Sequence, residues 1–137
     1  NVSDAYGQYG LRIAWDIHGK IPADSHLKDT TTPTVIFTNS KNSSCKNLEY
    51  VFVSAHEILL TKTLEYLYEQ GIQSLIVEGG TKTLQTFIDA GIWDEARVFT
   101  TKETFGSGIG APKIPYTAST KTTIGNALLE IAYKEEK

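Results

Sequence analysis

The sequence lacks methionine entirely and has a single cysteine, Cys45, among its 137 residues. One cysteine cannot close an internal disulfide, so a reducing compartment, the cytoplasm, is the expected setting. The three histidines do not follow the spacing of metal ligands, and no metal site is expected. No apolar run approaches the ~20 residues of a membrane-spanning helix. A net charge of −3 also gives no basic excess that would favour nucleic acid as a partner.

The length is that of one domain able to bury its own core, and the hydrophobic fraction of 40% is ordinary for a globular protein. A translated chain begins with methionine, whereas this one begins at Asn1. We therefore expect it to be part of a longer protein.

Three strands are predicted first, at residues 11–16, 34–38 and 50–53, because β-branched and aromatic residues concentrate there between polar turns. The run YVFV at residues 50–53 suggests burial on both faces, as in parallel sheets.

Helical spacing begins at Thr61, the predicted N-cap, and stops at Gly71-Ile72. A strand at 75–77, a second helix ending at Gly91-Ile92 and a strand at 95–100 follow. Residues 121–125 and 127–133 suggest a closing antiparallel pair at one edge. This order predicts the α/β class with a mainly parallel central sheet, whose ligands bind at the carboxyl ends of strands.

The stretch SLIVEGGTKTL at residues 74–84 is the strongest candidate for such a site. Glycines between a strand and a helix allow a ligand to approach the backbone, and the first amides of a helix suit a phosphate. Lys82 lies in the first helical turn, where the helix dipole disfavours a cation unless an anion binds beside it. Glu78, at the predicted strand tip, needs hydrogen-bond donors that a polar substrate could supply. A simple Gly-Gly turn with an exposed glutamate remains the alternative.

Three segments resemble the reductase domain of bacterial bifunctional riboflavin-biosynthesis proteins. Residues 72–94 resemble the pattern G-I-x-S-L-x-V-E-G-G-x-x-L-x-x-x-F-x-x-A-G-L-x-D-E without gaps. Residues 11–27 resemble the R-x-x-x-D-x-x-x-R-I-P-x-x-S-x-L stretch, and residues 105–112, FGSGIGAP, resemble the glycine-rich loop near the substrate. The resemblance implies a dihydrofolate-reductase-like three-layer fold and a homodimer.

The resemblance also implies the reaction, which is the NADPH-dependent reduction of 5-amino-6-(5-phosphoribosylamino)uracil to its ribitylamino product. The carboxylate of Glu78 matches the position that hydrogen-bonds the substrate sugar. The residues implied to hold the cofactor pyrophosphate or to lie beside it are Gly79, Gly80, Thr81, Lys82 and Thr83. Related folds often have a cis peptide bond between such paired glycines.

The adenosine half of the cofactor is expected just past a strand end, at Thr38, Asn39 and Ser40. Lys20 replaces the family's arginine before Ile-Pro. A lysine there keeps the charge but not the fork geometry, so it either contacts the 2′-phosphate of the cofactor or is simply solvated.

Two family motifs are absent, namely S-x-D-G-x-I-A on an opening strand and a later D-N-P turn. Residues 1–137 are therefore expected to be the C-terminal part of a reductase domain, preceded in the whole protein by a zinc-dependent deaminase domain. We expect such a chain to hold part of the site and to have little activity alone.

Two other functions stay open. A dihydrofolate-reductase-like enzyme that reduces a pterin or folate would share the fold, although its pterin-binding acid lies elsewhere in the chain than Glu78. A non-catalytic nucleotide-binding or assembly module is compatible with the absent motifs.

Overall fold

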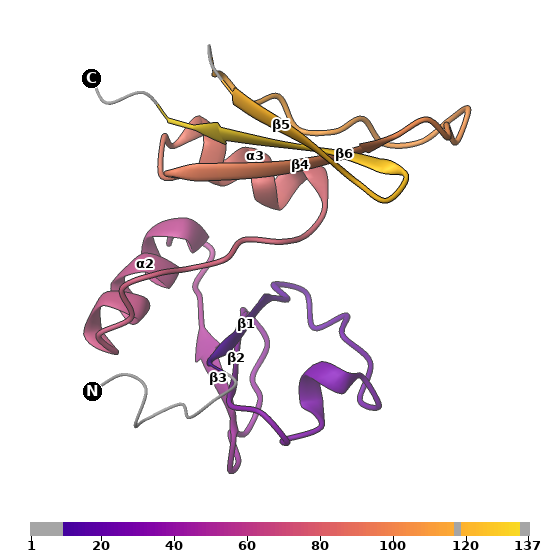
Figure 1. Cartoon of the computed structure of the whole chain (residues 1–137). Helices are drawn as coiled ribbons and strands as arrows, with labels where there is room; N and C mark the ends of the chain where they lie inside the picture. The colour runs from indigo at the N-terminus through magenta and orange to yellow at the C-terminus, as the bar shows by residue number, and fades with distance from the viewer. Residues whose placement is uncertain (1–9, 117–118, 135–137) are drawn as a thin grey trace. The chain divides into compact units, whose positions relative to one another are not determined.

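The computed structural model describes residues 10–116 and 119–134, and the chain divides into two compact units, Asn1–Leu75 and Ile76–Lys137. Figure 1 shows the course of the chain through these two parts, here called the N-terminal and C-terminal units. The N-terminal unit contains β1 (Arg12–Trp15), the 3₁₀ helix η2 (His26–Lys28), β2 (Thr34–Thr38), β3 (Leu48–Phe52) and α2 (Leu59–Glu69). The C-terminal unit contains α3 (Thr81–Asp89), β4 (Glu95–Thr101), β5 (Ser119–Ile124) and β6 (Ala127–Tyr133).

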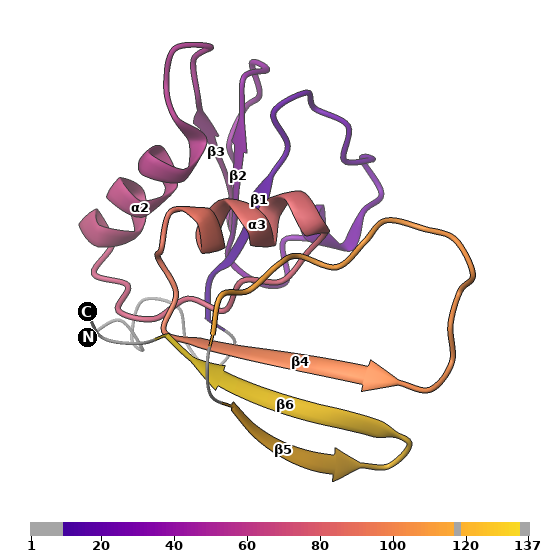
Figure 2. The ribbon, with the colours of Figure 1, turned by 90° about the horizontal axis from the view of Figure 1, so that it is seen from above.

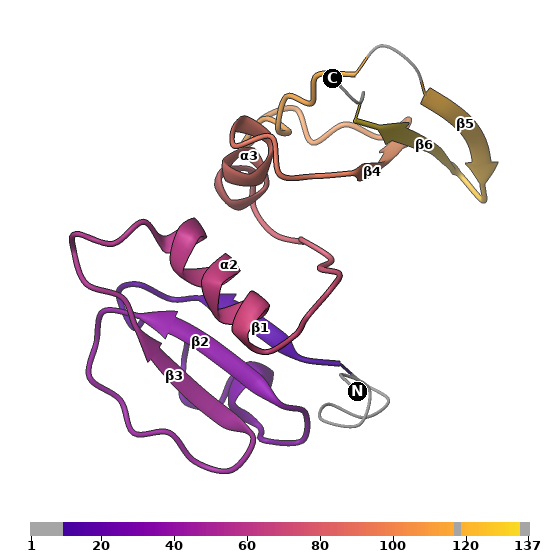
Figure 3. The same cartoon turned by 90° about the vertical axis from the view of Figure 1, so that its left-hand side faces the viewer.

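A parallel sheet in the order β1-β2-β3 forms the N-terminal unit, with α2 along one face (Figure 3). Every residue of the central strand β2 is buried, and this explains its unbroken run of β-formers. Phe37 of β2 meets Tyr66 of α2 edge to face, with ring centroids 5.7 Å apart. The indole N–H of Trp15 donates to the buried Thr63 hydroxyl at 2.9 Å. The Tyr66 hydroxyl also donates to Glu49 Oε2 of β3 at 2.7 Å. Aromatic packing and these two polar pairs therefore hold α2 on the sheet.

Both helices end as the sequence predicts, with a left-handed glycine followed by an isoleucine. Gly71 has φ +69° and Gly91 has φ +67°, a region that residues with a Cβ rarely adopt. The closing bonds run from Ile72 N–H to Leu67 O at 2.9 Å and from Ile92 N–H to Phe87 O at 3.0 Å. These are the long hydrogen bonds of Schellman motifs.

The predicted cap at Thr61 is wrong, because α2 begins two residues earlier, at Leu59, after Ile58 as N-cap. Ile58 makes no side-chain capping bond. Leu60, Thr63 and Leu67 are the buried residues of this helix. Burial of Leu60 in the first turn outweighs the capping preference of a threonine, which is worth only about 1 kcal/mol.

An antiparallel sheet in the order β4-β6-β5 forms the C-terminal unit (Figure 2). The predicted closing pair is confirmed, with β5 and β6 joined by a hairpin whose Gly125 has φ +60°. The strand predicted at residues 95–100 is confirmed as β4. The mixed α/β class is thus confirmed, with the parallel and antiparallel strands in separate sheets.

The strand predicted at Leu75–Val77 is wrong. Residues 73–77 have no regular secondary structure and pair with no strand in the described part of the chain. Leu75 is 39% exposed and Ile76 is 86% exposed. β-propensity reflects packing against neighbouring strands, and without such neighbours three β-formers do not make a strand.

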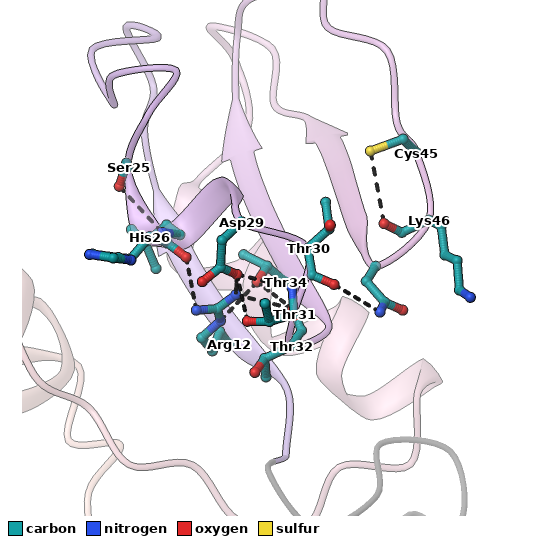
Figure 4. A network of polar contacts seen from close by, with 12 residues as sticks. Arg12, Ser25, His26, Asp29, Thr30, Thr31, Thr32, Thr34, Cys45 and Lys46 are labelled. Carbon is teal, nitrogen blue, oxygen red and sulfur yellow. Dashed lines mark hydrogen bonds and ion pairs between the residues drawn. The ribbon is translucent and has the colours of Figure 1, made fainter.

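Arg12 joins the amino ends of β1 and β2 to the loop that precedes β2 (Figure 4). Its guanidinium donates to Asp29 Oδ1 at 2.8 Å, to His26 O at 2.9 Å and to Thr34 Oγ1 at 3.0 Å. Thr31 also donates to Asp29 Oδ1 from its amide and its hydroxyl. Hydrogen bonds from Arg12, and then from Thr31, lower the pKa of Asp29 from 3.8 to about 2.

This shift predicts how stability depends on pH. The folded-state pKa of Asp29 lies below its ordinary value, so the contribution is present above pH 3.8 and is lost as the pH falls towards about 2. We expect Asp29→Asn to lower the urea midpoint at pH 7 and the difference from wild type to shrink across that window. Asp24→Asn, an exposed aspartate of the same loop, is the control. A difference that stays constant down to pH 2 would contradict this origin.

Candidate functional site

The glycine pair forms a turn directly before α3. Gly79 has φ +145°, which favours glycine, whereas Gly80 is the N-cap with φ −71° and ψ 164°. The peptide bond between them is trans, so the cis bond common in related folds is not present here. Thr81, Lys82 and Thr83 make up the first helical turn, as predicted.

The amides of this first turn are open to a ligand. Gly80 offers no side-chain cap, and the first turn contains no acidic residue. Within residues 10–116 and 119–134, no backbone acceptor is found for the N–H groups of residues 81–83. The Lys82 side chain is exposed and adds positive charge beside them. This donor set fits a phosphate or diphosphate.

The glycine-rich segment at residues 105–112 returns to this turn, and Figures 2 and 3 show the chain after β4 running back alongside α3. The Thr81 hydroxyl donates to Gly110 O at 2.6 Å. The turn at residues 79–83, predicted to bind the cofactor, and the glycine-rich segment, predicted to border the substrate, therefore touch within the C-terminal unit.

Glu78 precedes the turn and is exposed, not at the tip of a buried strand as predicted. In the described part of the chain its carboxylate has no hydrogen-bond or ion-pair partner. The carboxylate is thus available to accept bonds from the hydroxyl groups of a ligand.

The other predicted cofactor residues come together in the N-terminal unit, at the carboxyl ends of β1 and β2. Thr38 is buried, and its hydroxyl accepts the Ser40 amide at 3.1 Å. The Asn39 amide donates to Ile17 O at 3.2 Å. Gly19 lies against Ser40, because a Cβ at Gly19 would be 3.1 Å from Ser40 Oγ. The loop that carries Lys20 is therefore fixed beside the end of β2.

Asp16 organises this loop, although it was not among the predicted site residues. Its buried carboxylate accepts the amide of Lys20 at 2.6 Å and that of Ile21 at 2.9 Å. The signal was available, because Asp16 directly follows a strand and occupies the aspartate position of the R-x-x-x-D stretch.

A hollow of about 420 Å³ adjoins Ser40. Its lining comprises Ser40, Lys41, Asn42, Tyr50 and Phe52. Burial, followed by coulombic interactions with Cys45 and Asp16, raises the pKa of Tyr50. Two aromatic rings beside a lysine suit a nucleotide base and a phosphate. Except for Ser40, these residues were missed, although Tyr50 and Phe52 share one strand face by their alternation.

The candidate residues thus form two groups, one within each unit. Within the residues that the structure describes, no cluster of three histidine, cysteine or acidic side chains could hold a metal. None of the described helices is long and apolar enough to cross a membrane.

Solved structures with the same architecture define the fold class. A bifunctional deaminase and 5-amino-6-(5-phosphoribosylamino)uracil reductase of Thermotoga maritima aligns with a TM-score of 0.66 and 20% identity, covering 90% of this chain and 37% of that one. The riboflavin biosynthesis reductase Rib7 of Saccharomyces cerevisiae aligns with a TM-score of 0.69 and 18% identity, covering 93% of this chain and 73% of that one. The chain therefore has the dihydrofolate-reductase-like fold of riboflavin-pathway reductases, as predicted.

The sequence matches the family described as RibD C-terminal domain over residues 3–123, and the chain belongs to this family. The riboflavin biosynthesis protein RibD of Aquifex aeolicus is 29% identical over 106 residues, covering 72% of this chain and 29% of that protein. RibD of Chlamydia trachomatis is 28% identical over 92 residues, covering 61% of this chain and 24% of that protein. The matched part thus spans less than a third of the length of these curated relatives.

Proposed function

We propose that this chain contributes to an NADPH-dependent reductase that converts 5-amino-6-(5-phosphoribosylamino)uracil to its ribitylamino product. The observation that carries this proposal is the uncapped start of α3, where no backbone acceptor is found in the described part of the chain for the amides of Thr81, Lys82 and Thr83. The exposed Glu78 precedes this turn in the sequence. Membership of the RibD C-terminal domain family supports the reaction class.

In the C-terminal unit, the turn provides the anion site. Gly79 gives the turn its φ of +145°, and Gly80, with open space where a Cβ would lie, lets a diphosphate approach the amides. Lys82 offsets the negative charge of the phosphates. When bound at this turn, NADPH would supply a hydride for the first carbon of the opened sugar.

Glu78 acts on the substrate side. Its carboxylate accepts hydrogen bonds from the sugar hydroxyls and orients the sugar, with no proton transfer assigned to it. Because Glu78 is the residue before the glycine pair, one short segment orients both ligands.

In the N-terminal unit, Asn39 and Ser40 hold the adenosine half of NADPH, with the neighbouring hollow for the adenine ring. The buried Thr38 supports them from inside β2 by accepting the Ser40 amide. Lys20 contacts the 2′-phosphate through its ammonium group. Asp16 contributes by fixing the Lys20 backbone. The lysine of this loop would then favour NADPH over NADH.

The wider assembly belongs to the proposal as well. We assign this chain to the C-terminal part of a reductase domain that works with a deaminase domain, as a homodimer in the cytoplasm. Two curated relatives are named RibD and are more than three times as long as the segment they share with this chain. The single cysteine, exposed and free, suits a reducing compartment.

Two alternative functions differ from this proposal in the ligand that they would bind or in turnover. A pterin or folate reductase would have no sugar hydroxyls to place against Glu78. A non-catalytic module would bind the nucleotide without turnover. The position of Glu78 beside the anion turn favours the sugar-phosphate reductase.

Titration of NADPH fluorescence with the chain, followed by an assay of NADPH oxidation with the aminouracil substrate, tests the proposal. We expect the isolated chain to bind NADPH more tightly than NADH and to turn over little substrate. Robust turnover by this chain alone would contradict the partial site, and an absence of NADPH binding would remove the cofactor assignment. Dihydrofolate in place of the aminouracil is the control for the folate alternative.

A further inference from the structure

Three polar side chains lie along one line of α3 at intervals of four residues, Thr81, Gln85 and Asp89. Residues four apart in a helix lie on the same face. Thr81 and Gln85 contact the end of the glycine-rich loop and the residue that follows it, and Asp89 orients Gln85. Thr81 donates its hydroxyl to Gly110 O at 2.6 Å.

Gln85 makes the central contact, in which its carboxamide pairs with both backbone groups of Lys113. The Lys113 amide donates to Gln85 Oε1 at 2.9 Å, and Gln85 Nε2 donates to Lys113 O at 3.3 Å. Nε2 also donates to Asp89 Oδ1 at 2.7 Å. A carboxylate only accepts hydrogen bonds, so Asp89 selects the amide orientation in which Oε1 faces Lys113.

The loop between β4 and this contact has few attachments of its own. Residues 102–110 are all exposed, and Phe105 is fully exposed. The hydrogen bonds found there are local, from Ser107 N–H to Phe105 O and from the Thr101 hydroxyl to Glu103 O. The contacts at Gly110 and Lys113 therefore decide where the end of the loop lies.

We propose that Gln85 is a positioning residue that holds the glycine-rich loop, residues 105–112, against the start of α3. This inference rests on the proposed function, in which the loop borders the substrate and the turn at residues 79–83 holds the cofactor. Gln85 reaches the site only through the backbone of Lys113. Its loss should loosen the loop and weaken the use of substrate, with the cofactor turn intact.

Gln85→Ala and the isosteric Gln85→Glu test this, with Thr86→Ala as the matched control. Thr86 is exposed on the same helix, and its hydroxyl bonds to Lys82 O within that helix. In Gln85→Glu the side chain keeps its size, but a carboxylate faces Asp89 and the carbonyl of Lys113. If Gln85 only fills space, Gln85→Glu should behave like wild type. If its carboxamide positions the loop, Gln85→Glu should behave like Gln85→Ala.

The first readout needs no activity. Amide exchange at Lys113 and chymotrypsin cleavage after Phe105 are measured in the full chain. We expect both to speed up about five- to tenfold in the two Gln85 variants, the effect of one net hydrogen bond, and not in Thr86→Ala. Rates equal to the control in both variants would overturn the positioning role.

The second readout is kinetic and uses the natural polypeptide that carries this sequence. We expect the KM for the aminouracil to rise about tenfold in both Gln85 variants, as for one lost hydrogen bond, with the NADPH Kd within about twofold of wild type. An unchanged KM would overturn the inference. If the wild type neither binds NADPH nor reduces the aminouracil, the proposed function fails, and exchange and cleavage still decide whether Gln85 holds the loop.

Discussion

Replacing Gly80 by aspartate is expected to weaken NADPH binding about 100-fold, while α3 stays as stable as in wild type or becomes slightly more so. The new carboxylate would lie at the N-cap, accept an open amide of the first turn and repel the diphosphate. A charged hydrogen bond is worth about 1.5–3 kcal/mol, which corresponds to about 10- to 100-fold in affinity. NADPH fluorescence titration and thermal unfolding measure the two effects.

Gly80→Asn is the matched control, because it has the same size and can cap the helix without a charge. Gly80 has φ −71° and open space where a Cβ would lie, so both side chains fit without backbone strain. We expect Asn to weaken binding less than Asp at equal thermal stability. Equal NADPH affinity in wild type and Gly80→Asp would remove the anion turn from the site.

Replacing Glu78 by glutamine is expected to lower kcat/KM for the aminouracil about 100-fold and to leave NADPH affinity unchanged. In the proposed site the Glu78 carboxylate would offer both oxygens to the sugar hydroxyls, whereas a carboxamide keeps one acceptor and loses the charge. Stopped-flow or steady-state oxidation of NADPH by the natural polypeptide that carries this sequence gives kcat/KM, and a separate titration gives the affinity for NADPH.

Glu69→Gln, an exposed glutamate at the end of α2, serves as the control for a lost surface charge. If Glu78→Gln weakened NADPH binding as much as it lowered kcat/KM, Glu78 would belong to the cofactor side. If it changed neither, the sugar assignment would fail and the pterin or folate alternative would gain support.

The local features of the site could be predicted from the sequence, because they depend on neighbouring residues. Gly80 as the residue before a helix, Lys82 in the first turn and the two glycine-isoleucine helix ends follow from backbone preferences within a few positions. Strand β2 could also be predicted from the sequence, since a short run of β-formers bounded by polar turns indicates a buried strand.

Long-range contacts explain what the sequence argument missed. Asp16 looked like the last residue of a strand, yet its carboxylate binds two amides of the following loop. The pairing of Gln85 with Lys113 joins positions 28 residues apart and has no local signal. The hollow at Tyr50 and Phe52 likewise depends on the polar loop that follows β2.

By itself, the sequence determined the α/β class, both helix ends and the uncapped glycine turn, because each follows from preferences that act over one or two helical turns. Only the tertiary structure decided that α2 starts at Leu59, where burial outweighs capping, and that Leu75–Val77 forms no strand. The tertiary structure also decided that the glycine-rich segment meets the turn before α3, through the bond from Thr81 to Gly110. These outcomes depend on partners distant in the chain, whose packing and hydrogen bonds a local pattern does not contain.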